Sequence, residues 1–438
     1  MSKLLEKITC KLVLEDMKKH IDPSQFAGQK KLSTEHYLVK MIDNILKAID
    51  NNDNKAVIAL FIDWDSAYNR VDHTLGMEAF IKCGVRPALL PLIANYFQDR
   101  SMVVHWNNAT SDSFDLPGST AQGSTYGCLE FIAISNDNTH FAKPEEAYKF
   151  MDDLSLLTVV NLVGTGLATY NLKNHVPSHI PTHNQIIHSD HLQAQHYLHQ
   201  VDKWTQEKRM KLNSKKTKCM IFNPSRKRQF TTDLKLQGEL IEVVSQYKSL
   251  GIILSSDLTW NLNTAKIVKN ANMRMKILHT AAKFTSNISD LKIIYKTYIR
   301  SVLEYGANVW HSGLTNQNKN DIERLQKSSL KIILKNNYVN YKNALKFMNM
   351  DSLEKRREKL NLNFAKKCLK IDKMKVLFPM SSKNHEMKTR DIKKYKVNKA
   401  KKERRKNSSV IYMQKLLNNH VVKKYCYKGT VHKLVQNP

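Results

Sequence analysis

The sequence predicts an α+β fold, in which an antiparallel sheet with helices is followed by a region built from helices alone. Two patterns carry this prediction. Residues 56–63, AVIALFID, form an unbroken apolar run of strand length that ends in a carboxylate, which is typical of a buried central strand. From about residue 264 onward, apolar residues instead recur at helical spacing, as at Ile267, Ile277 and Leu278. The chain therefore changes structural class near this position.

The first hundred residues predict a helix, a strand and an interrupted helix. Residues 35–50 place their apolar side chains on one face of a helix, and the strand over residues 56–63 follows. A second helix is expected over residues 73–98. Gly84 and Pro87 should interrupt it, because proline lacks the amide hydrogen that a helix interior needs.

The elements in the middle of the chain are shorter. VVHW at 103–106 and the turn residues Asn107–Asn108 predict a hairpin, which leads through a glycine-containing loop to a helix over residues 124–134. A second hairpin is expected at Asp152–Asp153, between two apolar segments. A helix over residues 190–211 comes next, and the segments KCMIFN and EVVSQYKSLGIIL predict further strands.

The strongly basic composition indicates a polyanionic partner. The 438 residues include 70 lysines and arginines against 39 aspartates and glutamates, which gives a formal net charge of +31 and a pI near 9.7. Such an excess attracts phosphate backbones in a salt-sensitive way, but it would equally suit an anionic membrane surface or a ribosomal neighbour. Charge therefore indicates a class of partner and not a reaction.

The chain carries no sequence signal for secretion or for a membrane. Its six cysteines are widely scattered, without a close pair that would suggest a zinc or redox motif. Charges interrupt every apolar stretch of the first twenty residues, and no apolar run is long enough to span a bilayer. We expect an intracellular protein of the nucleus, the cytoplasm or both, with no membrane partner.

Three carboxylates are candidates for a metal site. Asp63 ends the strand over residues 56–63, although an aspartate at a strand end is more often a cap or turn residue. Asp152 and Asp153 lie where a tight hairpin can aim both toward one point. Because adjacent acids repel, a cluster of three is stable only if a positive charge, usually a divalent cation, neutralises it.

A Gln–Gly loop lies between these carboxylates in the sequence. The segment 116–124, LPGSTAQGS, contains Gln122 and Gly123 and opens a helix. Most Gly/Ser loops are only turns, but the order of features is distinctive: a strand ending in Asp63, the Gln–Gly loop, and FMDD in a hairpin, all within about 90 residues. This order resembles the palm of reverse transcriptases.

The rest of the chain is similar to the reverse transcriptases of non-LTR retrotransposons. FIDWDSAYNRVDH resembles their first catalytic motif, GSTAQGSTYGCLEF the Gln–Gly loop, and FMDD the catalytic hairpin. KLNSKKTKCMIF resembles the lysine-bearing strand region and YKSLGIIL the primer-grip hairpin, while IRSVLEYGANVWHSGL and DSLEKRREKLNLNFAKK resemble thumb and connection segments. The resemblance covers almost the full length and implies an RNA-directed DNA polymerase, which is a nucleotidyltransferase.

The resemblance implies four regions. Residues 1–55 would hold part of the fingers and the helix leading into the palm, so that the chain would resemble an element copy truncated at the N-terminus. Residues 56–262 would form a right-hand polymerase palm with a histidine-rich insertion at about 160–200. Residues 263–370 would form an α-helical thumb and connection, and residues 371–438 a basic helical C-terminal region. Its run of lysine and arginine predicts a solvated tail, or a helix that orders on nucleic acid.

The resemblance also implies a catalytic mechanism. Asp63, Asp152 and Asp153 would ligate two Mg²⁺ ions, which Mn²⁺ could replace, about 3.5–4 Å apart. The primer 3′-hydroxyl would attack the α-phosphate of the nucleotide, and Lys216 would act as an acid near the pyrophosphate. The partners implied are an RNA template, a DNA primer and deoxynucleoside triphosphates, and the oligomeric state stays open.

Substrate contacts are implied for the residues around the carboxylates. Tyr68 would stack under the deoxyribose and exclude a ribose 2′-hydroxyl, while Gln122 and Gly123 would contact the incoming nucleotide. Each assignment has a plainer alternative: Tyr68 could be a core aromatic, Gln122 a loop amide and Lys216 a surface lysine. Asp65 and Asp72 are interpreted as structural, as a cap or salt-bridge partner.

Some features depart from the family pattern. Ala121 replaces the usual proline before Gln122, and Glu130 lies in a segment that relatives fill with apolar residues, where an unpaired carboxylate would cost several kcal/mol. A second hypothesis is therefore a catalytically inactive, element-derived remnant that binds RNA or DNA. A third, a basic nucleic-acid-binding protein unrelated to polymerases, predicts that the acids lie apart in space.

Two further residue patterns have competing interpretations. His175, His179 and His183 share a four-residue spacing, but intervening prolines would break the helix that a zinc site needs, so a polar surface insertion is favoured. The pairs Arg356–Arg357 and Arg404–Arg405 could contact template phosphates or lie on solvated helix faces.

Overall fold

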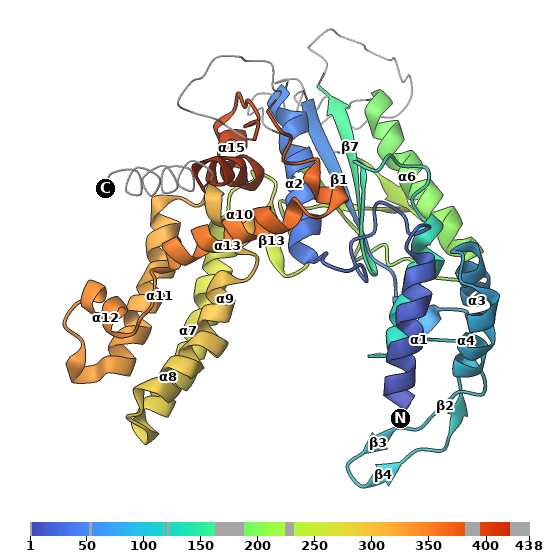
Figure 1. Ribbon diagram of the computed structural model, residues 1–438. Helices are drawn as coiled ribbons and strands as arrows, with labels where there is room; N and C mark the ends of the chain where they lie inside the picture. Colours follow the sequence, from blue (N-terminus) through green and yellow to red (C-terminus); the bar gives the residue numbers. More distant parts are fainter. Residues whose placement is uncertain are drawn as a thin grey trace, which may run out of the picture. The chain divides into compact units, whose positions relative to one another are not determined.

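The computed structural model describes residues 2–51, 55–116, 118–120, 123–162, 188–223, 232–381 and 395–420 (Figure 1). The chain divides into two compact units. Unit 1 comprises Met1–Tyr37 and Asn52–Ser245, and unit 2 comprises Leu38–Asn51 and Gln246–Pro438. Within the described residues, no helix is both long and apolar enough to cross a membrane.

Unit 1 contains a five-stranded sheet with the order β11-β8-β1-β7-β6. The central strand β1 runs antiparallel to both β7 and β8, whereas the short strand β11 runs parallel to β8. The strands are β1 (Lys55–Ile62), β6 (Ala147–Phe150), β7 (Asp153–Asn161), β8 (Lys218–Phe222) and β11 (Glu242–Val243). The mixed sheet-and-helix fold, the strand over residues 56–63 and the hairpin at Asp152–Asp153 are confirmed.

The central position of β1 explains its composition. Its seven residues from Ala56 to Ile62 are all buried, since strands flank it on both sides. Its alternate residues Ala56, Ile58, Leu60 and Ile62 belong to the hydrophobic core of unit 1. Helix α6 packs on β7, while α1 and α3 pack on α5. These helices span α1 (Ser2–Met17), α3 (His73–Lys82), α5 (Thr125–Ile134) and α6 (His188–Glu207).

The expected interruption of the second helix is confirmed. Helix α3 ends at Lys82, Gly84 adopts a φ of 77°, and α4 (Leu90–Phe97) begins after a short turn at Pro87–Leu89. The following hairpin carries two small ladders, with its turn at Asn107 as expected. Its strands are β2 (Ser101–Met102), β3 (His105–Trp106), β4 (Ala109–Thr110) and β5 (Phe114–Asp115).

Unit 2 is mostly helical, as the pattern after residue 264 predicts. It includes the main part of α2 (Thr34–Asn51), a two-stranded hairpin and a series of helices (Figure 1). Its remaining elements are β12 (Gln246–Ser249), β13 (Ile252–Ser255), α7 (Asn261–Phe284), α8 (Ile288–Ile294), a π-helical stretch at Tyr295–Arg300, α9 (Ser301–Glu304), α10 (Ala307–Trp310), α11 (Asn316–Leu334), α12 (Tyr341–Phe347), α13 (Leu353–Cys368), α14 (Asp372–Lys375), α15 (Glu403–Lys406) and a helix over residues 409–420.

The described part of the basic C-terminal region is not a solvated tail, so that expectation is wrong for residues 395–420. The Asp50 carboxylate accepts hydrogen bonds from the backbone amides of Lys401 and Lys402 at 3.1 and 2.7 Å. Arg405 is 3% exposed and forms an ion pair with the buried Asp43. Acidic groups on α2 thus anchor the lysine- and arginine-rich segment within unit 2.

Burial also corrects the interpretation of the paired arginines. Arg357 is fully buried, with its Nε 3.2 Å from His311 Nδ1 and its guanidinium 5.8 Å from the centre of the Trp310 ring. Arg356 donates to Glu304 at 2.6 Å. Neither Arg357 nor Arg405 is therefore exposed to contact a template phosphate in this conformation.

Candidate active site

The three candidate carboxylates meet at one end of the paired strands β1 and β7. Asp63 directly follows β1, whose last residue Ile62 lies opposite Leu154. Asp153 begins β7 and pairs with Phe150 across a two-residue turn formed by Met151 and Asp152. The antiparallel register therefore brings Asp63 beside the turn, although about 90 residues separate them in sequence.

The pKa shifts of these groups indicate a cluster of negative charge. Burial, followed by the charges of Asp152 and then Asp63, raises the pKa of Asp153 to about 6. Burial also raises the pKa of Asp63, with further contributions from Asp152 and Asp65, while Lys216 opposes the shift. The pKa of Asp152 is raised by burial. The charge of Asp152 thus destabilises the charged forms of Asp63 and Asp153, and Asp63 adds to this effect on Asp153.

The donor chemistry of this cluster fits a hard divalent cation. Among the described residues, Asp63 Oδ2 is buried without a hydrogen-bond partner. No three histidine, cysteine, aspartate or glutamate side chains in the described ranges are already arranged around a common metal position. Magnesium at polymerase sites is held by one or two carboxylates together with substrate phosphates and water, rather than by a cage of protein ligands. The available carboxylate oxygens match that mode of binding.

The segment 211–217 holds the backbone around Asp63. The sequence indicated Lys216 in this segment but not the contacts of Asn213 and Thr217 with Asp63. The Asp63 amide donates to Thr217 Oγ1 at 3.2 Å, and the Asp63 carbonyl accepts from the Asn213 amide at 2.8 Å. Asn213 also accepts from the Lys216 amide, through its side chain at 3.1 Å. This turn brings the Lys216 charge within the electrostatic range of Asp63. The polar Thr217 side chain is fully buried, which fits its role as the acceptor of the Asp63 amide.

Tyr68 lies between the carboxylates and the Gln–Gly loop. Its half-buried ring packs 5.0 Å from the ring of Phe131, as measured between centroids. Burial, then the charges of Asp152, Cys128 and Asp153, raises the pKa of the Tyr68 hydroxyl. The residue therefore combines a core contact with proximity to the site.

Only part of the Gln–Gly loop lies within the described residues. Ala121 and Gln122 lie outside them. The preceding stretch is fixed to the chain after Asp63, because Thr120 donates its amide to the Tyr68 carbonyl at 2.8 Å. A side chain at Gly118 would meet the Val71 carbonyl at 2.8 Å, and Gly123 has a φ of 85°. Gly118 therefore permits the close approach to Val71, and Gly123 the left-handed backbone conformation.

The structural interpretation of the other acids is confirmed. Asp72 caps α3 by accepting hydrogen bonds from the Thr74 and Leu75 amides, and it pairs with Arg209 at 2.8 Å. Asp65 pairs with Arg70 at 3.4 Å. The histidines at positions 175, 179 and 183 lie outside the described residues.

Glu130 is buried, as its position in an apolar segment suggests, but it has a partner. Its Oε1 lies 3.1 Å from His73 Nδ1, while Oε2 is buried with no hydrogen-bond partner among the described atoms. Burial raises the pKa of Glu130, against the opposing effect of His73. Gly76 leaves the necessary space, since a Cβ there would lie 2.4 Å from Oε1.

Comparison with known proteins gives two sequence relatives, and no protein-family model matches the chain. The chain is 24% identical over 347 residues to "Probable RNA-directed DNA polymerase from transposon BS" of Drosophila melanogaster, an alignment that covers 76% of this chain and 35% of the relative. It is 22% identical over 321 residues to "RNA-directed DNA polymerase from mobile element jockey" of Drosophila funebris, covering 71% of this chain and 32% of the relative. The chain thus spans about a third of the length of these relatives.

A structural comparison aligns the chain with telomerase from Candida albicans. That alignment covers 84% of this chain and 54% of the telomerase chain, with 10% identity and a TM-score of 0.31. Similarity at this level does not inform the fold.

Proposed function

We propose that this chain, a homologue of the RNA-directed DNA polymerases of retrotransposons, extends a DNA primer on an RNA template by nucleotidyl transfer. Its two sequence relatives bear out the resemblance predicted from the motifs. The observation that carries the proposal is the meeting of Asp63, Asp152 and Asp153 at one end of the β1–β7 pair. It argues against an unrelated nucleic-acid-binding protein, which predicts acids that lie apart.

In this proposal the sheet of unit 1 is the palm, and helices of unit 2 from α7 onward form the thumb and connection. The fold supports this assignment through its central strand, its hairpin and the helical class of the residues that follow. The boundaries at residues 55, 262 and 370 stay predictions.

Asp63, Asp152 and Asp153 would hold two divalent cations through their carboxylate oxygens. When bound, Mg²⁺ supplies positive charge that activates the primer hydroxyl and stabilises the leaving pyrophosphate, and Mn²⁺ could replace it. Lys216 offsets part of the negative charge near Asp63 and would provide a proton to the pyrophosphate.

Tyr68 and the Gln–Gly loop would select and orient the nucleotide. The Tyr68 ring is held against Phe131, so its position can limit the space at the sugar 2′-carbon. The hydrogen bond from Thr120 to the Tyr68 carbonyl links this ring to the loop that carries Gln122 and Gly123. These contacts support the proposed role of Tyr68, whereas the substrate roles of Gln122 and Gly123 stay predictions.

The net charge of +31 supports a nucleic-acid template as partner. A cavity of about 950 Å³ in unit 1 adds a local feature, because Arg70, Arg100 and Arg209 line it together with Thr120. Two of these arginines also pair with aspartates, so the cavity is less positive than its arginines alone suggest. The sequence relationship to polymerases does not favour the inactive remnant.

Primer extension on a defined RNA template with Mg²⁺ tests the function. We expect Asp152→Asn to lower single-nucleotide incorporation by about 10³-fold, since removing a ligand costs several kcal/mol of transition-state stabilisation. Asp202→Asn on α6 is a matched control, because the Asp202 carboxylate accepts hydrogen bonds from Gln206 and Gln237, neither of which belongs to the proposed site. Equal incorporation by wild type and Asp152→Asn would refute the site. Template binding without any incorporation by the wild type would favour the remnant.

A further inference from the structure

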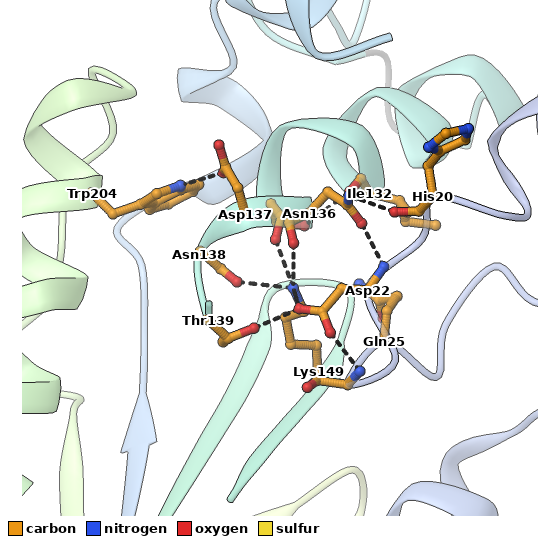
Figure 2. Close-up of polar contacts among 12 residues, drawn as sticks. His20, Asp22, Gln25, Ile132, Asn136, Asp137, Asn138, Thr139, Lys149 and Trp204 are labelled. Carbon is orange, nitrogen blue, oxygen red and sulfur yellow. Dashed lines mark hydrogen bonds and ion pairs between the residues drawn. The ribbon is translucent and has the colours of Figure 1, made fainter. Parts of the chain in front are cut away.

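A buried lysine lies within the hairpin of β6 and β7, three residues before Asp152. Lys149, on β6, is 1% exposed and directs its ammonium group at four oxygen atoms (Figure 2). Lys149 Nζ donates to the carbonyls of Ser135 and Asn136 at 2.8 and 3.2 Å and to Asn138 Oδ1 at 3.1 Å. It also pairs with Asp22 Oδ2 at 2.5 Å. Such a complete set of acceptors is what a buried ammonium group requires.

Asp22 is equally well satisfied. Its carboxylate accepts from the Ser24 amide at 2.6 Å and from the Thr139 hydroxyl at 2.5 Å, in addition to Lys149. Burial by itself raises the pKa of Asp22, but the charge and hydrogen bond of Lys149, followed by the hydrogen bonds from Thr139 and Ser24, outweigh it, so the pKa lies below its usual value. The Asp22 amide donates to Asn136 Oδ1 at 2.7 Å, which ties the same two segments together a second time.

This ion pair fixes the N-terminal segment along β6, up to the turn that carries Asp152. Gln25 forms a parallel bridge with Lys149, supported by hydrogen bonds from the Lys149 amide to the Ser24 carbonyl and from the Phe26 amide to the Lys149 carbonyl. Gln25 Oε1 then accepts from the Met151 amide at 3.4 Å. Met151 has a φ of 57°, which is unfavourable for a residue with a side chain and needs support from its surroundings.

The turn at residues 135–139 connects the ion pair of Lys149 and Asp22 to the Asp63 side of the site. Asp137 accepts a hydrogen bond from Trp204 Nε1 at 2.7 Å, as Figure 2 shows. The Trp204 ring packs edge-on against the ring of Trp64 with centroids 6.1 Å apart, and Trp64 directly follows Asp63. The turn at residues 135–139 therefore contacts two groups. One is Lys149, on the strand before the Met151–Asp152 turn, and the other is Trp204, which packs against the residue after Asp63.

We propose that Lys149 and Asp22 are positioning residues. Their ion pair, in which Lys149 is buried and Asp22 is partly exposed, holds residues 22–27 along β6 and thereby fixes the Met151–Asp152 turn that aims the carboxylates. The catalytic consequence rests on the proposed polymerase function. The positioning of the turn concerns only this chain and can be measured without activity.

The test compares Lys149→Met with Val160→Ala. Methionine keeps the length of the side chain and removes its charge, whereas Val160 is a fully buried residue at the far end of β7, opposite Ala56. Each variant is studied at the same interval below its own melting temperature. The readouts are hydrogen–deuterium exchange of the amides of residues 150–154 and steady-state incorporation of one nucleotide.

We expect Lys149→Met to speed exchange across residues 150–154 by at least about tenfold relative to Val160→Ala. We also expect kcat to fall by about 10–100-fold, with the nucleotide KM changed by less than about twofold, because misplaced catalytic groups slow chemistry more than binding. If Lys149→Met does not fold, Asp22→Asn removes the same pairing with less disturbance and is judged by the same criteria.

Two outcomes would overturn the proposal. Exchange at residues 150–154 that matches Val160→Ala would show that the pair contributes only general stability. Faster exchange with an unchanged kcat, in a wild type that extends primers, would show that the turn does not need this support. If the wild type incorporates no nucleotide, the proposed function fails, while the exchange result still decides whether the ion pair positions the turn.

Discussion

Two neighbouring clusters on the hairpin of β6 and β7 have opposite electrostatic character. One residue pair behind the tip, where Lys149 lies opposite Leu154, the Asp22 carboxylate has three hydrogen-bonding partners, including Lys149, and its pKa lies below the usual value. At the tip, Asp153 has a pKa raised to about 6, and Asp63 keeps a buried oxygen without a partner among the described residues. The fold thus supplies positive and hydrogen-bonding partners to Asp22, a few residues behind the tip. It leaves the carboxylates at the tip with unneutralised charge, which a bound cation can neutralise.

The largest effect on the free energy of unfolding is expected at the ion pair of Lys149 and Asp22. Lys149→Met should lower the free energy of unfolding by about 3–5 kcal/mol, because it leaves Asp22 and three other oxygen acceptors buried without their cation. Urea-induced unfolding measures this change. Adding Asp22→Asn should recover part of the loss, since it removes the uncompensated charge. A double variant no more stable than the single one would attribute the loss to packing instead of charge.

A smaller effect of opposite sign on the free energy of unfolding is expected at Asp153, at the tip of the hairpin. Asp153→Asn should stabilise the fold by up to about 1 kcal/mol, because it removes a charge that burial and then the repulsion from Asp152 and Asp63 disfavour. The same change should abolish primer extension. Thermal melting and incorporation assays on one preparation measure both effects. A loss of stability comparable to that of Lys149→Met would mean that Asp153 is compensated as fully as Asp22, and the contrast between the two clusters would fail.

Local sequence patterns predicted the elements that hold this site, but not the groups that fix them. The apolar run before Asp63 and the interrupted apolar stretch around Asp152 suffice to predict a strand and a hairpin, because these elements depend on neighbouring residues. Lys149 and Asp22 are 127 residues apart, so only the folded chain brings them together. A lysine inside a short strand looks solvent-facing until its acceptors, in the turn at residues 135–138, are known.

The same limit explains the error in the C-terminal region. A run of lysines and arginines is usually solvated, and composition contains no sign that Asp43 and Asp50, more than 350 residues earlier, would bind residues 401–405. Asp72, by contrast, was correctly interpreted, because helix capping is a local property that its position before α3 reveals. Roles for Gln122 stay predictions, since that residue lies outside the described chain.

The smallest effect on stability is expected at Glu130, a buried carboxylate whose charge is compensated only in part. It lies between the fully compensated Asp22 and the uncompensated Asp153. His73 on α3 and Arg100 lower its pKa and Asp72 raises it, but burial dominates and the net shift is upward. The folded state therefore binds the Glu130 proton more tightly than the unfolded state does. As the pH rises above the unfolded value of about 4.3, the unfolded chain ionises first and the stability contributed by Glu130 is lost.

Replacing this carboxyl by a neutral amide should remove that loss. Glu130→Gln is expected to raise the melting temperature at pH 7 by about 2–4 °C, the shift that roughly 1 kcal/mol produces in a unit of this size. The gain should shrink toward zero at pH 4, where the wild-type carboxyl is protonated in both states. Glu78→Gln, an exposed change of the same kind on α3, should leave the melting temperature nearly unchanged at either pH. If Glu130→Gln raises the melting temperature equally at pH 4, the effect comes from packing against Gly76. If it lowers the melting temperature at pH 7, His73 compensates Glu130 as completely as Lys149 compensates Asp22.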